Sequence, residues 1–439
     1  MDFAAAFVLF LGAMLFCLAR GFALYWALAL ALALFFAVGL RRGHGARALA
    51  RMAWSKMPQT MIVLRILFLI GILTGLWRSC GTIAFFIYYG IRAVYPPLFV
   101  LLAFLLSALL SYALGTSFGV ASTAGVVLMA LARSGGVAPA VAAGAVMSGI
   151  YFGDRGAPTS SCASLVAALT ETDLYGNVKR MHQTALLPYA LCLAFYAALS
   201  LRNPVASVDE TLLSALAARF TLSFWALLPA LIMLALPLLR VPIWLAMSVS
   251  GACAFAVSVL AQGESAARTL RVCVLGFAPE GALAQVLTGG GLVSMLTVFL
   301  MLPLASMMTG ILEGTGALDG AQDRIAALGG RLGLLPTTML LSVLCSMVLC
   351  NQTIVVLMLR QLVGPVYERA GASNEELAMD IANSGVTIAG LVPWCIACAV
   401  PLGMLGVGAE ALPCAALLYT IPLCYLFTKK RFFRRRTEP

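Results

Sequence analysis

The sequence is poor in charge. Only 10% of its 439 residues are charged, whereas 62% are hydrophobic, and ordinary soluble domains carry about 25% charged residues. This composition excludes a soluble globular domain. Apolar runs recur from one end of the chain to the other, each of about 20 residues and so long enough to cross roughly 30 Å of hydrocarbon. The sequence therefore predicts an all-α polytopic membrane protein.

Several chemistries lack the residues that they need. The chain has two histidines, His44 and His182, and both fall in basic loops, so no serine–histidine–aspartate arrangement is expected inside the membrane. An intramembrane aspartyl protease uses two carboxylates, and we expect Asp154 to be alone there. No G-x-x-x-x-G-K-[ST] run occurs, which leaves ATP-driven transport unsupported. We therefore expect no enzyme and no cofactor. The sequence does not exclude a passive channel.

Positive charge exceeds negative charge, with a net charge of +11. Lys and Arg lie mainly between the apolar runs, as an orientation signal places them. We therefore expect a lipid bilayer as the partner and no nucleic acid. With the basic loops on the inside, the chain makes about ten crossings of the plasma membrane with both termini cytoplasmic.

One apolar segment, Met147–Val166, contains two adjacent charges, Asp154 and Arg155. A charge near the bilayer centre costs roughly 2.5–3.5 kcal/mol, so such residues usually line a water-filled path or a binding site. Pro158 follows them, and a proline opposes a continuous helix. The pattern predicts a helix over about 138–170 that breaks within the membrane, where the freed backbone groups can face a binding cavity.

The chain resembles itself at an offset of 235 residues. Pro158 falls on Pro393, and Gly75 and Gly81 fall on Gly310 and Gly316. The copies have opposite orientations in the expected topology, so we predict inverted repeats, each with a re-entrant hairpin and a broken helix. The expected organisation is an N-terminal helical hairpin and basic loop at 1–57, a first repeat at 58–200, a connecting pair at 201–289, a second repeat at 290–428 and a basic tail at 429–439.

Each expected hairpin has a polar tip. The helices at 98–113 and 120–132 are each too short to span comfortably, so they predict a re-entrant pair around Thr116, and 337–363 predicts a second pair around Asn351. The site is predicted where two tips and two helix breaks meet. Its candidate residues are Gly115, Thr116, Ser117, Asp154, Arg155, Thr159, Ser160, Ser161, Asn351, Gln352, Asn383, Ser384, Thr387 and Cys395.

The candidate residues offer hydroxyl, amide and carboxylate oxygens, which suit a hard cation such as Na⁺. Asp154, Thr116 and Asn351 are the candidate Na⁺ ligands. Asp154 could exchange a cation for a proton, because burial favours its neutral form. Alternatively, Arg155 neutralises Asp154 in a structural ion pair, or it receives a carboxylate substrate in a fork geometry.

Six segments together resemble the NhaC family of sodium/proton antiporters, over about 65–426. The resemblance implies inverted repeats, re-entrant hairpins, a homodimer and alternating-access exchange of Na⁺ for H⁺, or coupling to an organic solute. The segments are G-T-I-A-F-F-I-Y-Y-G (Gly81–Gly90), L-G-T-S-F-G (Leu114–Gly119), S-G-I-Y-F-G-D-R-G-A-P-T-S-S (Ser148–Ser161), G-I-L-E-G-T-G (Gly310–Gly316), C-N-Q-T (Cys350–Thr353) and L-V-P-W (Leu391–Trp394).

This chain also departs from that family. Members often carry acidic residues where it has Ser161 and Asn351, and another near Asn383. We therefore expect an Na⁺/H⁺ antiporter, with a Na⁺- or H⁺-coupled transporter or exchanger of a small carboxylate or amino acid as the alternative.

Overall fold

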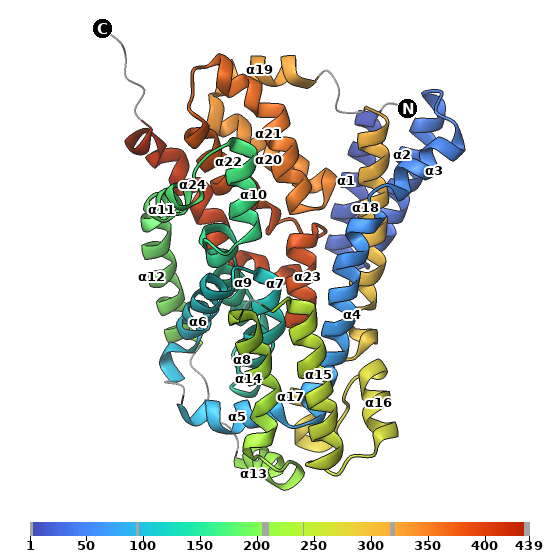
Figure 1. Ribbon diagram of the computed structural model, residues 1–439, viewed down its shortest axis with the longest axis vertical. Helices are drawn as coiled ribbons and strands as arrows, with labels where there is room; N and C mark the ends of the chain where they lie inside the picture. The colour runs from blue at the N-terminus through green and yellow to red at the C-terminus, as the bar shows by residue number, and fades with distance from the viewer. Residues whose placement is uncertain (1–2, 94–95, 204–209, 240, 317–320, 434–439) are drawn as a thin grey trace.

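The protein is a bundle of helices that is long in one direction. The computed structural model describes residues 3–93, 96–203, 210–239, 241–316 and 321–433, and that part of the chain contains no β-strand. In Figure 1 α1 begins and α24 ends near the same end of the long axis. The structure agrees with the all-α fold expected from the composition.

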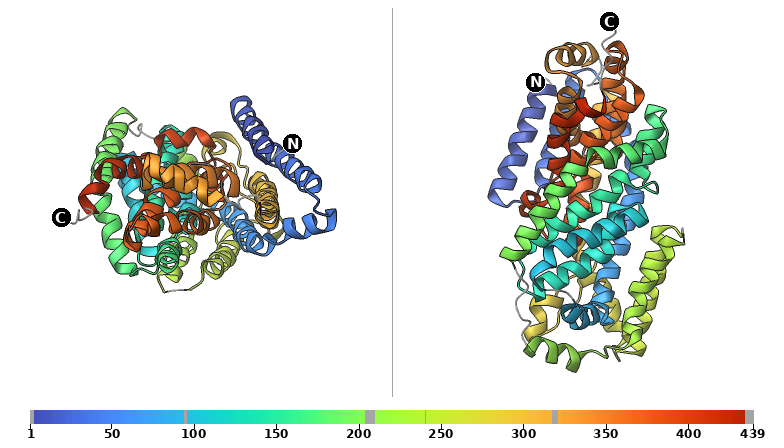
Figure 2. Two further views of the ribbon diagram at one scale, coloured as in Figure 1. Left: turned by 90° about the horizontal axis from the view of Figure 1, so that it is seen from above. Right: turned by 90° about the vertical axis from the view of Figure 1, so that its left-hand side faces the viewer.

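The first helices form a hairpin at the edge of the bundle (Figure 2). The turn between them includes Gly21, whose φ of 70° suits glycine. The basic loop that follows contains a helix whose apolar side chains Leu49 and Ala53 are buried. The helices are α1 (Phe3–Arg20), α2 (Tyr25–Arg41) and α3 (Ala46–Trp54).

The first half of the bundle holds the first expected hairpin and broken helix. Its elements are α4 (Met57–Ser79), α5 (Thr82–Ala93), η1 (Pro96–Leu98), α6 (Phe99–Leu114), α7 (Ser117–Val120), the π-helix η2 (Ala121–Gly125), α8 (Val126–Ser134), α9 (Pro139–Gly156), α10 (Ser161–Thr170), α11 (Leu174–Thr184) and α12 (Leu186–Arg202).

The connecting region packs on α4 and ends in a glycine-rich turn. Its elements are α13 (Glu210–Arg219), α14 (Phe224–Leu238), α15 (Ile243–Leu260), α16 (Ala266–Leu275), η3 (Gly281–Leu283), α17 (Ala284–Leu287) and η4 (Leu292–Met295). The second half then contains α18 (Leu296–Gly314), α19 (Ala321–Leu332), α20 (Leu334–Leu349), α21 (Gln352–Arg369), α22 (Asn374–Ala389), α23 (Ile396–Leu405), η5 (Ala409–Cys414) and α24 (Ala416–Phe432).

The self-similarity at an offset of 235 extends to the backbone. Helices α6 and α20 begin and end at matching positions and have 16 residues each. The residues that follow them, Gly115 and Cys350, are both left-handed, with φ of 67° and 53°. Glu171 after α10 and Gly406 after α23 match in the same way, with φ of 53° and 67°. Left-handed conformations are costly without glycine, so their recurrence supports duplication. The inverted orientation of the copies stays a prediction.

The first hairpin differs from expectation in one respect. The helix after its tip was expected to be too short to span, but α7, η2 and α8 run continuously from Ser117 to Ser134 and are apolar enough to cross a membrane. The π-helical turn joins α7 to α8 without a break, and Ser122 Oγ within it donates to Gly119 O at 3.0 Å.

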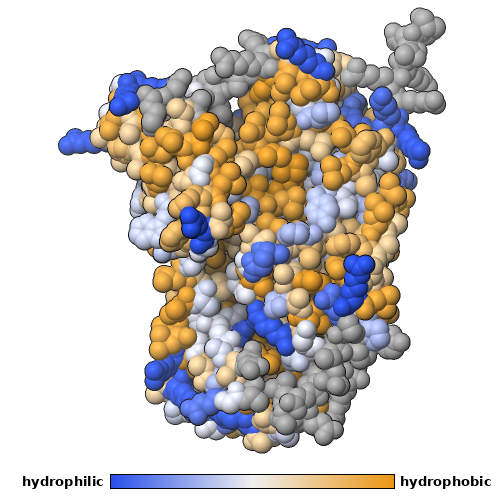
Figure 3. Space-filling view, turned by 180° about the vertical axis from the view of Figure 1, so that it is seen from behind, coloured by the Kyte–Doolittle hydropathy of each residue, from blue (hydrophilic) through white to orange (hydrophobic). Residues whose placement is uncertain are grey.

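Apolar helices and an apolar surface mark a membrane protein. In the described residues, four helices are long and apolar enough to span, or up to six if each of two bent helix pairs forms one span. Large apolar side chains such as Trp26, Leu109 and Phe224 are more than half exposed, and Figure 3 shows apolar residues over much of one face. The chain is therefore a multi-pass membrane protein.

Candidate functional site

A cavity of about 300 Å³ lies where the two hairpin tips and the two helix breaks meet. The tip at Gly115 is so close to the first break that a Cβ there would lie 2.5 Å from Thr159 atoms. At the second tip, Ile396 N–H donates to Cys350 O at 2.8 Å. The lining residues are Val63, Thr116, Ser117, Phe118, Asp154, Ser161, Cys162, Leu165, Asn351, Gln352, Thr353, Ile396 and Ala397.

Local sequence fixes the first break. Helix α9 ends at Gly156, and Ser160 caps α10 by accepting hydrogen bonds from the N–H groups of Cys162 and Ala163 at 3.1 and 3.2 Å. The Ser160 hydroxyl also donates to the backbone oxygen of Asp154. This serine therefore satisfies polar groups on both sides of the break, as a buried chain interruption requires.

The capping residues at the two hairpin tips also match. Thr116 Oγ1 accepts from Gly119 N–H at 3.3 Å, and Asn351 Oδ1 accepts from the N–H groups of Thr353 and Ile354 at 3.0 and 3.4 Å. Both residues are extended helix caps. Both helices therefore begin beside the cavity, which Thr116 and Asn351 line.

Asp154 is the one carboxylate among the residues that line this cavity. Its side chain is 6% exposed. Gln352 Nε2 donates to its Oδ2 at a long 3.4 Å, and Ser117 also hydrogen bonds to it. Within the described residues, no Lys, Arg or His forms a salt bridge with Asp154. The carboxylate therefore faces hydroxyl and amide groups rather than a fixed positive charge.

Arg155 lies on a different face of α9 from Asp154, because successive residues of a helix lie about 100° apart. Its Nη2 donates to Met181 O in α11, while its Nε and Nη1 are buried without a hydrogen-bond partner. Asn383 lies toward the same helix, with Nδ2 donating to Thr184 Oγ1 at 3.2 Å and Oδ1 unpartnered. The ion pair considered between Asp154 and Arg155 does not form in this structure.

The remaining predicted site residues lie outside the cavity lining. Thr159 packs on Gly115. Ser384 Oγ donates to Asp380 O at 2.5 Å and accepts from Ser342 Oγ of α20 at 3.1 Å, and Thr387 Oγ1 donates to Asn383 O at 3.1 Å. Six predicted residues line the cavity, namely Thr116, Ser117, Asp154, Ser161, Asn351 and Gln352.

A second buried aspartate, Asp380 in α22, was missed. It is fully buried, and it accepts hydrogen bonds from Tyr425 at 3.0 Å and from Tyr367 and Lys429. Lys429 also pairs with Glu376 at 2.7 Å. Asp154 is therefore not the one aspartate buried in the helices that break, since Asp380 is buried in α22. A lone Asp between Ala378 and Ile388 was the available signal, because such a charge needs a partner.

The lining suits a monovalent cation better than a tightly bound metal. No cluster of three or more His, Cys, Asp or Glu side chains occurs in the residues that the structure describes. Asp154 supplies a single negative charge, and Ser117, Ser161, Asn351 and Gln352 add neutral oxygens. Hard cations accept such oxygens.

Comparisons with known proteins agree with this arrangement. A Na⁺/H⁺ antiporter family model matches residues 149–428, which include both breaks. The chain is 30% identical to a Na⁺/H⁺ antiporter of Haemophilus influenzae over 380 residues, 83% of this chain and 81% of that protein. It is 25% identical to the Na⁺/H⁺ antiporter NhaC of Alkalihalophilus pseudofirmus, over 85% of this chain and 84% of that protein.

A third relative carries an organic solute. The malate-2H⁺/Na⁺-lactate antiporter of Bacillus subtilis is 26% identical, over 81% of this chain and 78% of that protein. The matched region, the duplicated helix breaks and the polar cavity between them all agree with the resemblance seen in the sequence. The chain belongs to the Na⁺/H⁺ antiporter family.

Proposed function

We propose that this antiporter exchanges Na⁺ for H⁺ at the cavity around Asp154. The observation that carries the proposal is a buried carboxylate that faces a polar cavity without a cationic partner. Burial of an uncompensated charge is costly, and either a bound Na⁺ or a bound proton removes that cost. The two ligands therefore compete for one group, which is the basis of exchange.

The duplicated helices supply a route for alternating access. Both α10 and α23 begin at the cavity, where Ser161 and Ile396 line it. In Figure 1 α10 lies above α23, toward the end at which the termini lie. We infer inverted repeats that expose the cavity to each side in turn, in a homodimer of the plasma membrane with both termini cytoplasmic.

Proton flux in proteoliposomes tests this proposal. In wild-type vesicles, added Na⁺ should collapse a pre-set proton gradient. Asp154→Asn should abolish that response, because the amide keeps the size of the side chain but cannot bind or release the proton. The matched control is Glu368→Gln, whose side chain is 63% exposed in a pair with Arg360, and it should behave as wild type. Full Na⁺-driven flux in Asp154→Asn would refute the assignment.

A second candidate is Na⁺- or H⁺-coupled exchange of a small carboxylate or amino acid. It is favoured by the buried, incompletely bonded guanidinium of Arg155 and by the malate–lactate relative. Counterflow of labelled malate or lactate in the same vesicles distinguishes the two. Uptake that requires Arg155 while Na⁺ binding survives would establish the second candidate.

A further inference from the structure

A second polar cavity, of about 350 Å³, lies at the far end of the helices that line the first. It is bordered by the last turns of α4 and α23, by α8 along its length and by the glycine turn before η4. Its lining residues are Thr74, Arg78, Val126, Met129, Arg133, Thr288, Gly289, Gly290, Ser294, Met295, Gly403, Met404, Leu405 and Gly406.

Two arginines face this cavity, and its lining contains no Asp or Glu. Arg78 is 8% exposed, donates from Nη1 to Thr74 O at 2.8 Å and leaves Nε buried without a partner. Arg133 Nη2 donates to Leu405 O and Gly406 O, each at 3.0 Å. Neither arginine forms a salt bridge within the described part of the chain. Two like charges beside one cavity without a counter-charge in its lining favour an anion there.

The wall of the cavity is firmly held. Phe277 and Gly289 exchange two backbone hydrogen bonds of 2.9 Å, and Gly291 N–H donates to Gly71 O at 2.8 Å. Gly290 has a φ of 75°, and a Cβ there would lie 2.5 Å from Gly75 N. The turn therefore depends on glycine for both its conformation and its contact with α4, and it keeps Thr288 and Ser294 beside the arginines.

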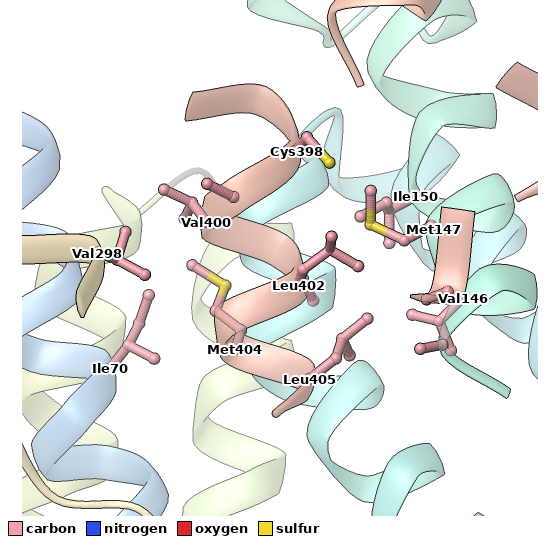
Figure 4. Packing of buried hydrophobic residues seen from close by; sticks show 14 of the residues in the cluster. Ile70, Val146, Met147, Ile150, Val298, Cys398, Val400, Leu402, Met404 and Leu405 are labelled. Carbon is pink, nitrogen blue, oxygen red and sulfur yellow. The ribbon is translucent and has the colours of Figure 1, made fainter. Parts of the chain in front are cut away.

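The two cavities are separate. Helix α23 reaches the Asp154 cavity with Ile396 and the arginine cavity with Leu405. Between these ends, the buried side chains of Cys398, Val400 and Leu402 pack around α23 with residues of neighbouring helices (Figure 4). Apolar packing therefore divides the cavities, and the arginine cavity is not part of the cation site.

We propose that the Arg78–Arg133 cavity binds a small organic anion with one or two carboxylates. Guanidinium groups bind carboxylates through paired charge-assisted hydrogen bonds, and the volume falls in the usual range for small-molecule pockets. A zwitterionic amino acid fits less well, because the lining offers no carboxylate to its ammonium group. This proposal does not depend on the exchange of Na⁺ for H⁺ at Asp154.

Thermal unfolding of the purified full chain tests the proposal without any flux measurement. The probes are succinate and lactate, with phosphate and chloride for comparison, at fixed Na⁺ and ionic strength. Succinate or lactate should raise the unfolding temperature of wild type as a binding ligand does. Arg133→Gln and Arg78→Gln should each weaken the apparent affinity about tenfold or more, because each removes a charged hydrogen-bond donor.

Arg331→Gln is the matched control. This exposed arginine in α19 loses the same charge and should keep the wild-type affinity. Arg133 is only half-buried, so its variant should fold even if Arg78→Gln does not. Equal stabilisation of wild type and Arg133→Gln would overturn the proposal. So would stabilisation by phosphate or chloride alone, or no stabilisation by either carboxylate.

Discussion

The two broken helices, α9–α10 and α22–α23, follow the same backbone course but treat their buried aspartates differently. Asp154 stands beside the first break, faces a cavity and has a long hydrogen bond to Gln352 as its one side-chain amide contact. Asp380 lies deeper in α22 and is held by Lys429 and two tyrosine hydroxyls. One carboxylate is left available to a ligand, whereas the other is neutralised by the fold.

This difference shows that a buried charge has to be judged by its partners. Both aspartates are costly in an apolar environment, but a complete set of donors makes Asp380 part of the structure. It joins α22 to α21 and α24, through Tyr367 and Lys429. The buried charge of Asp154 remains unfavourable until a cation or a proton binds to it. A loss of function without a loss of stability is thus expected at Asp154, and the reverse at Asp380.

The largest effect on stability is expected from Lys429→Met. The variant leaves Asp380 buried with no cationic partner, and breaking a buried pair in this way costs roughly 3–5 kcal/mol. The double variant Lys429→Met with Asp380→Asn should recover much of that loss. Thermal unfolding in detergent measures both. A single variant as stable as wild type would remove the contrast between the two aspartates.

A smaller loss is expected from Gly153→Ala, which tests the packing that presents Asp154. A Cβ there would lie 2.1 Å from Ser111 C in α6, and overpacking of this kind costs about 1–3 kcal/mol. Gly330→Ala is the control, because a Cβ at that helical position meets nothing within 4 Å and should slightly stabilise α19. Similar unfolding temperatures for the two variants would contradict the close helix contact.

The substitution Asn351→Asp tests whether a negative charge at the second hairpin tip changes the affinity of the site for Na⁺. Aspartate caps helices as well as asparagine does, so the start of α21 should keep its cap. The added carboxylate should lower the Na⁺ concentration for half-maximal exchange several-fold. Asn351→Ala, which loses the cap, should instead destabilise by about 0.5–2 kcal/mol. Proton flux measured against Na⁺ concentration checks this prediction. An unchanged Na⁺ affinity in Asn351→Asp would exclude Asn351 from the site.

The smallest effect is expected from Cys350→Gly. Cys350 is left-handed with a φ of 53°, and glycine at such a position relieves about 0.5–1 kcal/mol of strain. The converse change, Gly115→Cys, should destabilise, because a Cβ at Gly115 would lie 2.5 Å from Thr159. Thermal unfolding compares them. Destabilisation by Cys350→Gly would show that its side chain is needed for packing.

Much of the site could be predicted from the sequence because its features are local. Pro158 and Pro393 mark the breaks, and polar residues in apolar runs mark the tips at Thr116 and Asn351. The prediction that the breaks and the tips meet at one site rested on the internal repeat. The helix bounds agree closely, with α9 and α10 ending at Gly156 and Thr170.

The orientations of the charged side chains and their bonding partners were harder to predict from the sequence. Asp154 and Arg155 are neighbours in sequence but occupy different faces of α9, which the helical repeat of about 100° per residue would have indicated. Asp380 depends on Lys429, 49 positions away, and that lysine was assigned to the basic tail. Pairing across such a separation is set by how helices pack, which periodicity does not encode.

The glycines of α9 also limit how the transporter can move. Cβ atoms at Gly149 and Gly153 would lie 2.5 Å from Ser107 and 2.1 Å from Ser111, so α6 and α9 touch backbone to backbone. Two helices this close cannot slide past each other without separating first. They should therefore travel as one piece, carrying Asp154 and the tip at Thr116 together. The interface that separates during transport should therefore lie between this helix pair and the helices that close the cavity from the opposite side.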